Sequence, residues 1–297
     1  MTNTPVILTR NLTKSYGSLA AVQELNLSVG PNRITAFLGQ NGAGKSTTIK
    51  MLLGMVRPTN GDGSVLGKRI TDAEENRELR RRVAYVAENK PLYGYMTVER
   101  TIRFASSFYS DWRSDVASRL LNEYKLPARQ KVKTLSKGIR TKLALLLAFA
   151  RRPELLILDE PSEGLDPVGI EHLLQMLVAQ SAEGVAIFFS SHQIAEVERV
   201  ADHVCILEKG RLLVDASLDQ LRQCYRRVDL VFPFPPPEHE FRITGVERIQ
   251  TKGHQMSVFA SRNAEGVVER ARDLNAVSVE VAPVGLREIF LETVKEN

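Results

Sequence analysis

Apolar runs alternate with amphipathic segments along the first two thirds of the chain. The run "ITAFLGQ" (34–40) ends at a glycine and predicts a strand. The segment "GKSTTIKMLLGM" (44–55) has the apolar spacing of a helix, which we expect to stop at Gly54. A longer and more helical section follows, from about Pro91 to Arg152. Apolar strands separated by helices predict a mostly parallel sheet that is covered on both faces.

The alternation continues beyond this helical section. It predicts the strand "ELLILD" (154–159), the helix 168–182, the strand "GVAIFFSS" (184–191), the helix 194–202 and a single strand over 203–216. We therefore expect residues 1–225 to form one α/β domain, with a helical subdomain at about 89–152.

The pattern changes near Arg226. "VDLVFPFPPPEHEF" (228–241) carries four prolines, so it cannot be a continuous central strand. Beyond it we predict a hairpin (242–261), a helix capped by Asn263, a strand (276–284) and an amphipathic helix (286–297). We place the boundary at Tyr225–Pro237, and residues 226–297 are expected to form a small α+β accessory domain.

The composition of the chain excludes few classes of protein. The 297 residues are 43% hydrophobic and 25% charged, as in ordinary globular proteins, and the net charge of +5 does not by itself indicate nucleic acid. The longest apolar run, Leu143–Ala150, is much shorter than the roughly 18–20 residues that span a bilayer, and no secretory signal pattern begins the chain. Cys205 and Cys224 have no metal or redox spacing, and Cys205 fits a buried strand position. The expected compartment is the cytoplasm.

"GQNGAGKST" (39–47) matches the phosphate-loop pattern G-x-x-x-x-G-K-[ST]. Glycines let backbone N–H groups converge on phosphate oxygens, and the helix that follows presents its positive end to them. Lys45 can reach the β- and γ-phosphates, and the Ser46 hydroxyl can ligate Mg²⁺. A plain glycine-rich turn is the alternative, but a strand before the loop and a helix after it favour nucleotide. The expected nucleotide-binding residues here are Gly39, Asn41, Gly42, Ala43, Gly44, Lys45, Ser46 and Thr47.

The strand "LLILDE" ends in two acids. The carboxyl ends of strands are the usual ligand position in open α/β sheets, so this pair should lie beside the phosphate loop. Asp159 would there hold Mg²⁺, and Glu160 would act as general base toward the attacking water. By itself the pair could equally be solvated acids at a strand end.

Four motifs in order resemble those of ATP-binding cassette (ABC) ATPases: "GQNGAGKST", "LSKGIR" (135–140), "LLILDEPSEGLDP" and "SSH" (190–192). The resemblance covers Val6 to about Ala216. It implies a P-loop NTPase core of α/β class with an inserted helical subdomain, followed here by the small C-terminal α+β extension. It also implies ATP and Mg²⁺ as cofactors.

The family works as a head-to-tail dimer in which the signature of one subunit contacts ATP on the other. The resemblance therefore implies that Ser136, Lys137 and Gly138, at a helix N-terminus, grip the partner's γ-phosphate. Seven basic residues and no acid lie between Lys125 and Lys142, although a solvated helix face explains most of them.

Single positions also match family roles. Tyr16 corresponds to the aromatic residue that stacks on adenine, Asp166 to the aspartate that spans the dimer interface, and His192 to the switch histidine at the γ-phosphate. An exposed tyrosine and a structural histidine are the simpler alternatives at two of these positions. The resemblance makes His192 and Lys45 catalytic partners of Glu160.

Two positions depart from the family pattern in charge. Glu88 stands where the family has a glutamine that ligates Mg²⁺ or holds water, and Lys137 replaces a signature glycine. One charge could offset the other. Ile139 also replaces a glutamine and loses its amide.

The signature "LSKG" and a terminal "LREIF" (286–290) resemble bacterial export systems whose permease is a separate polypeptide. The resemblance implies an ATP-hydrolysing exporter subunit on the inner face of the membrane, as a homodimer or paired with a related ATPase subunit. The aromatics Tyr93 and Tyr95 would line the permease groove. An importer subunit and a soluble ABC ATPase acting on ribosomes or DNA are the alternatives, although no nucleic acid partner is expected.

Overall fold

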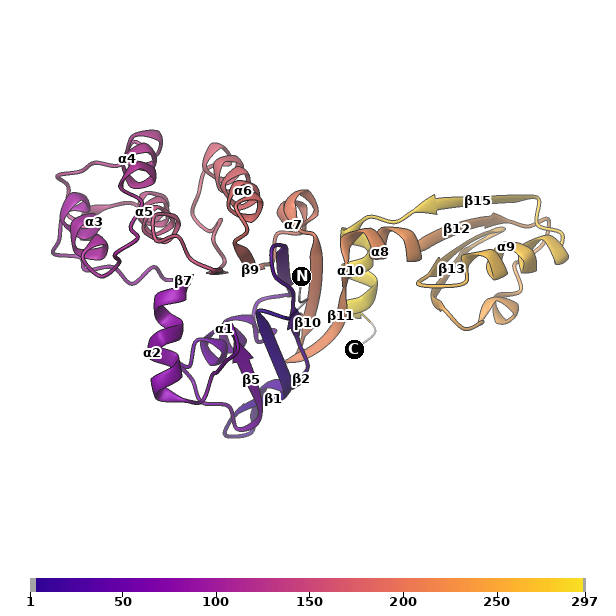
Figure 1. Cartoon of the computed structure of the whole chain (residues 1–297). Coiled ribbons are helices and arrows are strands. Elements are labelled where there is room, and N and C mark those ends of the chain that lie inside the picture. Colours follow the sequence, from indigo (N-terminus) through magenta and orange to yellow (C-terminus); the bar gives the residue numbers. More distant parts are fainter. Residues whose placement is uncertain (1–3, 296–297) are drawn as a thin grey trace. The chain divides into compact units, whose positions relative to one another are not determined.

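The computed structural model describes residues 4–295, which form two compact units that divide between Asp215 and Ala216. Figure 1 labels the elements of each unit along the chain. The division lies between Asp215 and Ala216, about ten residues before the predicted boundary. The second unit begins earlier because α8 (Leu218–Cys224) packs with the last helix, α10 (Leu286–Lys295).

A six-stranded sheet is the centre of the first unit. Its order is β11 (Arg211–Ser217), β10 (His203–Glu208), β4 (Ile34–Leu38), β9 (Ala186–Ser191), β8 (Leu155–Asp159) and β7 (Val83–Val86). The strands from β10 to β7 are parallel, as their apolar sequences predict. Every residue of β4, β8 and β9 is buried.

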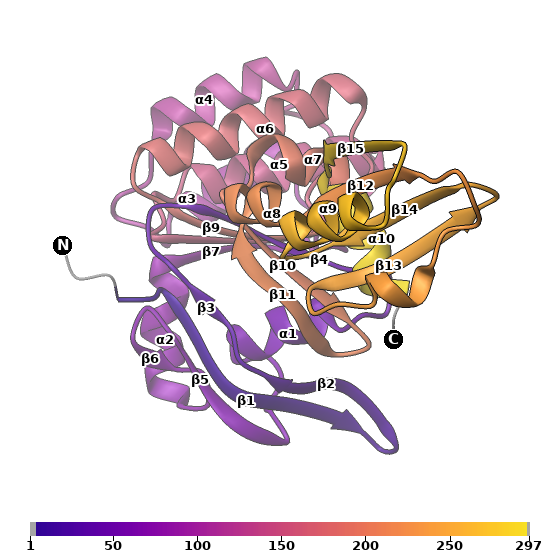
Figure 2. The ribbon, with the colours of Figure 1, turned by 90° about the vertical axis from the view of Figure 1, so that its right-hand side faces the viewer.

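A second, antiparallel sheet lies against this one. It contains β1 (Ile7–Tyr16), β2 (Leu19–Leu25), β3 (Ser28–Val29), β5 (Asn60–Val65) and β6 (Lys68–Arg69). One apolar core joins both sheets to α1 (Lys45–Leu52), through buried residues such as Leu12, Ile49 and Phe188. Figure 2 shows α1 and the antiparallel strands below the central sheet and α4, α5 and α6 above it.

The helices of the first unit follow the predicted order, with one addition, α2, that the sequence analysis did not predict. They are α1, α2 (Ala73–Arg82), α3 (Val98–Ser106), α4 (Ser114–Glu123), the short 3-10 helix η1 (Val132–Thr134), α5 (Lys137–Phe149), α6 (Pro167–Ala182) and α7 (Ile194–Val200). The range 89–152, expected to be a helical subdomain, contains α3, α4, η1 and α5.

The second unit is an antiparallel sheet with helices. Its strands pair in the order β13 (Val246–Lys252), β14 (Gln255–Ala260), β12 (Arg226–Val231) and β15 (Ser278–Pro283). The other elements are α8, η2 (Glu238–Phe241), α9 (Ala264–Asp273) and α10. The predicted hairpin is confirmed as β13 and β14. The second unit has an apolar core of its own, which includes Leu230, Phe241 and Val267.

Four details of the structure differ from the sequence predictions or refine them. The single strand predicted over 203–216 is wrong, because Lys209 and Gly210 have positive φ (47° and 80°) and turn the chain between β10 and β11. The central strand β12 ends at Val231, before the first proline. Asn263 occupies the N-cap of α9 in a left-handed conformation (φ 61°) and makes no side-chain capping hydrogen bond. The predicted last helix runs to residue 297, and its final two residues lie outside the described part.

Candidate active site

Strand register brings the predicted site residues to one edge of the central sheet. In the parallel ladders Leu38 pairs with Ser191, and Asp159 pairs with Ser190. The phosphate loop follows β4, the acidic pair ends β8, and His192 follows β9. Residues about 150 positions apart in the sequence therefore meet at the carboxyl ends of three neighbouring strands.

Two glycines of the phosphate loop are required by close backbone contacts. A Cβ atom on Gly39 would lie 2.5 Å from the carbonyl oxygen of Leu207, and one on Gly44 would lie 2.4 Å from that of Ala21. Gly44 also has a φ of 108°, which favours glycine. It occupies the N-cap of α1, so the loop leads directly into a helix whose first N–H groups are suited to bind an anion.

Lys45 is buried beneath this loop. Its Nζ donates to the carbonyl oxygens of Gly39 (2.8 Å) and Gln40 (3.2 Å), and lies 3.2 Å from Oε1 of Glu160. Lys45 is 6% exposed and the Glu160 side chain 8%. The ammonium group is therefore held at the loop, where incoming phosphate oxygens would meet it.

Glu160 is contacted on its other oxygen by His192. The Nδ1 atom of His192 lies 2.9 Å from Oε2 of Glu160, and Nε2 lies 3.1 Å from Nε2 of Gln193. A lysine and a histidine thus fix the two oxygens of one buried carboxylate. This arrangement leaves an oriented basic group at the end of β8.

The neighbouring Asp159 is joined to two hydroxyl groups. Its Oδ1 accepts hydrogen bonds from Ser46 Oγ (3.2 Å) and Ser190 Oγ (2.6 Å). Ser190 Oγ also accepts from the backbone N–H of Glu160 (3.0 Å). A carboxylate and a serine hydroxyl together suit a hard cation such as Mg²⁺. Sequence reasoning missed Ser190, whose position before the histidine in "FFSSHQ" was the available signal.

A surface pocket opens over these groups. The lining residues that were predicted to bind nucleotide or metal are Tyr16, Asn41, Gly42, Gly44, Lys45, Ser46, Thr47 and Glu88, and the predicted base Glu160 also lines the pocket. Tyr16 ends β1, is 49% exposed and has Lys14 Nζ 5.0 Å from its ring centre. A flat aromatic ring at the rim of a phosphate-binding loop can stack on a base. The predicted residues Ala43 and Gly39 do not line the pocket. Ala43 is buried, and Gly39 packs against Leu207 of β10.

The segment "LSKG" lies at the start of α5. Ser136 caps this helix by accepting from the N–H of Ile139 (3.3 Å), and Lys137 pairs with Glu163. The hydrogen bond from Lys137 holds the pKa of the Glu163 carboxyl below its ordinary value. A Cβ atom on Gly138 would lie 2.5 Å from the carbonyl oxygen of Gly164. Among the described residues that line the pocket over the phosphate loop, none comes from 136–138.

Asp166 caps the next helix. Its Oδ1 accepts from the N–H of Gly169 at 2.7 Å and lies 3.6 Å from Lys142 Nζ. The hydrogen bond from Gly169 and the nearby Lys142 hold the pKa of Asp166 below its ordinary value. The carboxylate is 61% exposed, so it stays charged and open to solvent.

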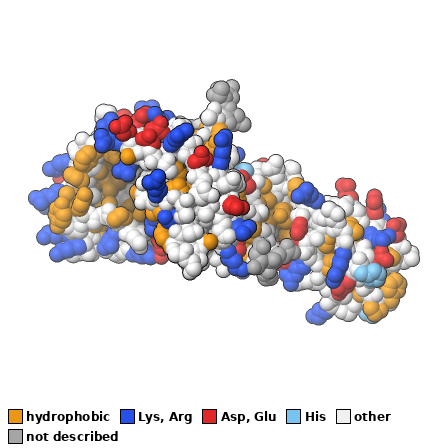
Figure 3. Space-filling view, turned by 90° about the horizontal axis from the view of Figure 1, so that it is seen from below, with side chains coloured by type: hydrophobic (Ala, Val, Ile, Leu, Met, Phe, Trp, Pro, Cys, Tyr) orange, Lys and Arg blue, Asp and Glu red, His pale blue; other side chains and the backbone are white. Residues whose placement is uncertain are grey.

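A groove lies beside the site, between β7, α3 and α5. Its wall includes the rings of Tyr93, Phe104 and Phe108, which contact one another in turn with centres 5.7 Å and 5.0 Å apart. Tyr95, also predicted to line the groove, packs against Tyr93 (5.8 Å) but is not one of the lining residues. All four rings are at least 40% exposed. Figure 3 shows hydrophobic side chains beside a hollow at this end of the first unit, with Lys and Arg side chains around it. Glu88 lines both this groove and the phosphate-loop pocket.

Another group of possible metal ligands joins β10 to β11. Nε2 of His203 and Sγ of Cys205 lie 2.5 Å and 3.4 Å from Oδ1 of Asp215. Cys205 is fully buried, and this burial raises the pKa of its thiol. The three groups already satisfy one another, so we interpret them as a structural link between two strands. The turn at Lys209–Gly210, missed in the sequence, creates this link.

Comparisons with known proteins agree with this geometry. Residues 22–163 match the ABC transporter family model. The chain is 35% identical over 225 residues to the bacitracin transport ATP-binding protein BcrA of Bacillus licheniformis, covering 75% of this chain and 73% of BcrA. It is 32% identical to the lantibiotic transport ATP-binding protein SrtF of Streptococcus pyogenes, covering 71% and 90% of the two chains.

The fold is shared with solved cassettes. The structure of an ATP-binding subunit of an ABC transporter has a TM-score of 0.67 at 34% identity, covering 73% of this chain and 92% of that one. A dimeric ATP-binding cassette in a post-hydrolysis state with ADP and Pi has a TM-score of 0.65 at 22% identity, with 71% and 98% covered, and shows the shared fold alone. The chain belongs to the ABC transporter family, as an ATP-binding ATPase component.

Proposed function

We propose that the chain hydrolyses Mg²⁺-ATP to drive export through a separate membrane permease. The single observation that carries the hydrolytic part is the buried Glu160 carboxylate, held between Lys45 and His192 at the mouth of a phosphate loop. A carboxylate fixed in this way is suited to take the proton of a water that attacks the γ-phosphate.

Each neighbour has a role in this proposal. Lys45 and the loop N–H groups bind the β- and γ-phosphates, and His192 orients the base. Tyr16 stacks on the adenine. Ser46 and Asp159 would hold Mg²⁺, with Glu88 beside them, and the bound cation would neutralise phosphate charge.

The signature segment supports a dimer. Ser136, Lys137 and Gly138 lie at the start of a thirteen-residue helix, outside the phosphate-loop pocket of their own chain. A second cassette arranged head to tail would bring this helix N-terminus to its partner's γ-phosphate. Asp166, exposed at the N-cap of α6, would contact the partner there. The dimer partner is a second copy or a related ATPase subunit.

The aromatic groove is the proposed permease site. No helix within residues 4–295 is long and apolar enough to cross a bilayer. Exposed tyrosine and phenylalanine side chains are typical of interface centres. The names of BcrA and SrtF, which state transport of bacitracin and of a lantibiotic, support a role in transport. The chain would then work in the cytoplasm, at the inner face of the membrane.

Purification of the tagged chain from detergent-solubilised membranes tests the partner. We expect an integral membrane protein to co-purify, and the variant Phe104→Asp to lose it. Phe234→Asp is the matched control, since Phe234 is similarly exposed (46% against 40%) but lies in the second unit. Co-purification of nucleic acid, without a membrane protein, would instead favour a soluble non-transport ABC ATPase.

A further inference from the structure

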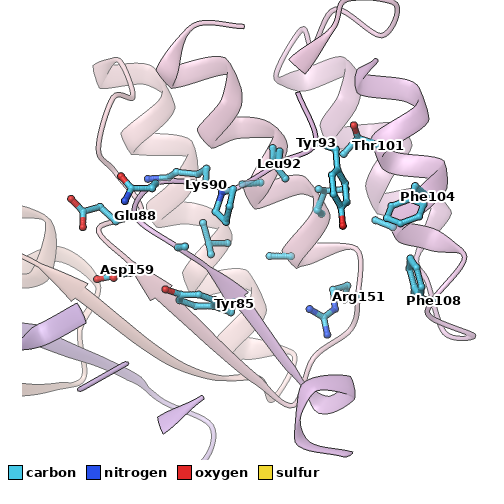
Figure 4. A pocket seen from close by; sticks show the side chains of 18 of the residues that line it. Tyr85, Glu88, Lys90, Leu92, Tyr93, Thr101, Phe104, Phe108, Arg151 and Asp159 are labelled. Carbon is cyan, nitrogen blue, oxygen red and sulfur yellow. The ribbon is translucent and has the colours of Figure 1, made fainter. Parts of the chain in front are cut away.

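Lys90 is a buried lysine that the phosphate-loop chemistry does not use. It follows Glu88 by two residues, is 4% exposed and lines the aromatic groove. Its Nζ donates a hydrogen bond to the backbone carbonyl oxygen of Glu160 at 3.3 Å. Figure 4 shows Lys90 between Glu88 and the aromatic wall of the groove. One side chain therefore connects the groove to the backbone of the proposed base.

Burial of this ammonium group is unfavourable for folding. Removal of an ammonium group from water costs free energy, which the nearby carboxylates of Glu163 and Glu88 only partly offset. Glu163 itself pairs with Lys137. The hydrogen bond of the Lys90 amine goes to a peptide carbonyl, which is a weaker partner than a carboxylate.

The backbone of Glu160 needs such a contact. Glu160 has a φ of 46°, a left-handed conformation that non-glycine residues adopt only where their surroundings fix it. Its N–H donates to Ser190 Oγ at 3.0 Å, and its carbonyl oxygen accepts from the N–H of Glu163 at 3.2 Å and from Lys90. Lys90 completes the set of contacts that holds this peptide.

We propose that Lys90 is a positioning residue for hydrolysis, which holds the Glu160 peptide so that its carboxylate stays between Lys45 and His192. This role rests on the proposed function, in which Glu160 is the base. A base displaced by about an ångström can lose on the order of 10²-fold in rate.

The test compares Lys90→Met with Lys125→Met in the full chain. Both lysines have left-handed backbone (φ 43° and 49°), but Lys125 is exposed and lines neither the groove nor the phosphate-loop pocket. Single-turnover hydrolysis, with protein in excess over Mg²⁺-ATP, measures the chemical step even when turnover is slow. Titration with ATP measures affinity, and a thermal melt measures stability.

For Lys90→Met we expect hydrolysis to slow by about 10- to 100-fold, with ATP affinity within twofold of the wild type. The melting temperature should be unchanged or higher, because methionine fills the site without burying a charge. Lys125→Met should match the wild type in all three. In a Glu160→Gln background, Lys90→Met should leave the ATP-bound dimer unaffected.

Two results would overturn the proposal. A Lys90→Met rate within twofold of the wild type would show that Glu160 is positioned without the lysine. A joint fall of rate, ATP affinity and melting temperature would show that Lys90 is a structural residue only. Neither result depends on the permease, so the Phe104→Asp experiment can fail or succeed independently.

Discussion

The Nδ1 atom of His192 lies 2.9 Å from Oε2 of Glu160, while Oε1 of the same carboxylate lies 3.2 Å from the ammonium of Lys45. Lys45 follows the loop after β4, and His192 follows β9. The central sheet therefore brings both partners to the same carboxylate. Bound phosphate would share the Lys45 ammonium with Glu160, while His192 contacts the other carboxylate oxygen.

The first prediction concerns Glu160 itself. Replacing it with glutamine keeps the shape and the contact to His192 but removes the basic group. We expect Mg²⁺-dependent hydrolysis to fall by about 10²- to 10⁴-fold, and the variant to accumulate as an ATP-bound dimer. Phosphate release and size-exclusion chromatography with ATP measure these effects. If the wild type itself neither hydrolyses ATP nor dimerises, even with candidate permeases, the chain is better described as a nucleotide sensor.

His192→Ala should slow hydrolysis while leaving the fold intact. The histidine side chain is 40% exposed, so its removal costs little packing, but the base loses the group that orients it. We expect a rate lower by about 10- to 100-fold and an unchanged melting temperature. His239→Ala, at a histidine that is 79% exposed in the second unit, is the control. Equal rates for the two variants would mean that His192 is dispensable.

Much of the site could be predicted because its parts are local in sequence. The phosphate loop has fixed spacing, and the acids at 159–160 end an apolar strand, so Gly44, Lys45 and Glu160 are readable directly. Ser190 and Lys90 were not predicted as site residues. The role of Ser190 depends on the register between β8 and β9, which places it opposite Asp159. The role of Lys90 depends on its long side chain, which reaches the backbone of Glu160, 70 residues later. The turn at Lys209 was also missed, because a lysine with positive φ has no clear signature.

The charged departures at Glu88 and Lys137 give a third prediction. Glu88 lines the phosphate-loop pocket, and Lys137 pairs with Glu163 in its own chain. Glu88→Gln removes a negative charge near the phosphates and should tighten ATP binding by about 2- to 5-fold. Lys137→Gly should weaken the ATP-bound dimer by a similar factor. Fluorescent nucleotide titration and analytical ultracentrifugation measure the two effects.

The double variant Glu88→Gln/Lys137→Gly tests whether these charges offset each other. Compensation predicts nucleotide affinity and hydrolysis nearer to the wild type than in either single variant. The hypothesis fails if each single variant leaves both ATPase activity and nucleotide affinity unchanged.

The last prediction concerns the pH dependence of stability at Glu196, in α7. Burial raises the pKa of this carboxyl above its ordinary value of 4.5, with the nearby Glu160 adding to the shift and a hydrogen bond from Ser162 opposing it. The folded state therefore binds the proton more tightly than the unfolded chain does. Stability from this group is present below pH 4.5 and is lost as the pH rises through the raised pKa.

Glu196→Gln removes that loss, since the amide never ionises. The variant should melt at the same temperature as the wild type near pH 4 and at a higher temperature at pH 8. The difference in melting temperature between variant and wild type should grow as the pH rises from 4 to 8. Thermal melts across this range measure it, with Glu269→Gln, at an exposed position of α9, as the control. A melting-temperature difference that stays constant with pH would mean that Glu196 is as well solvated in the folded chain as in the unfolded one.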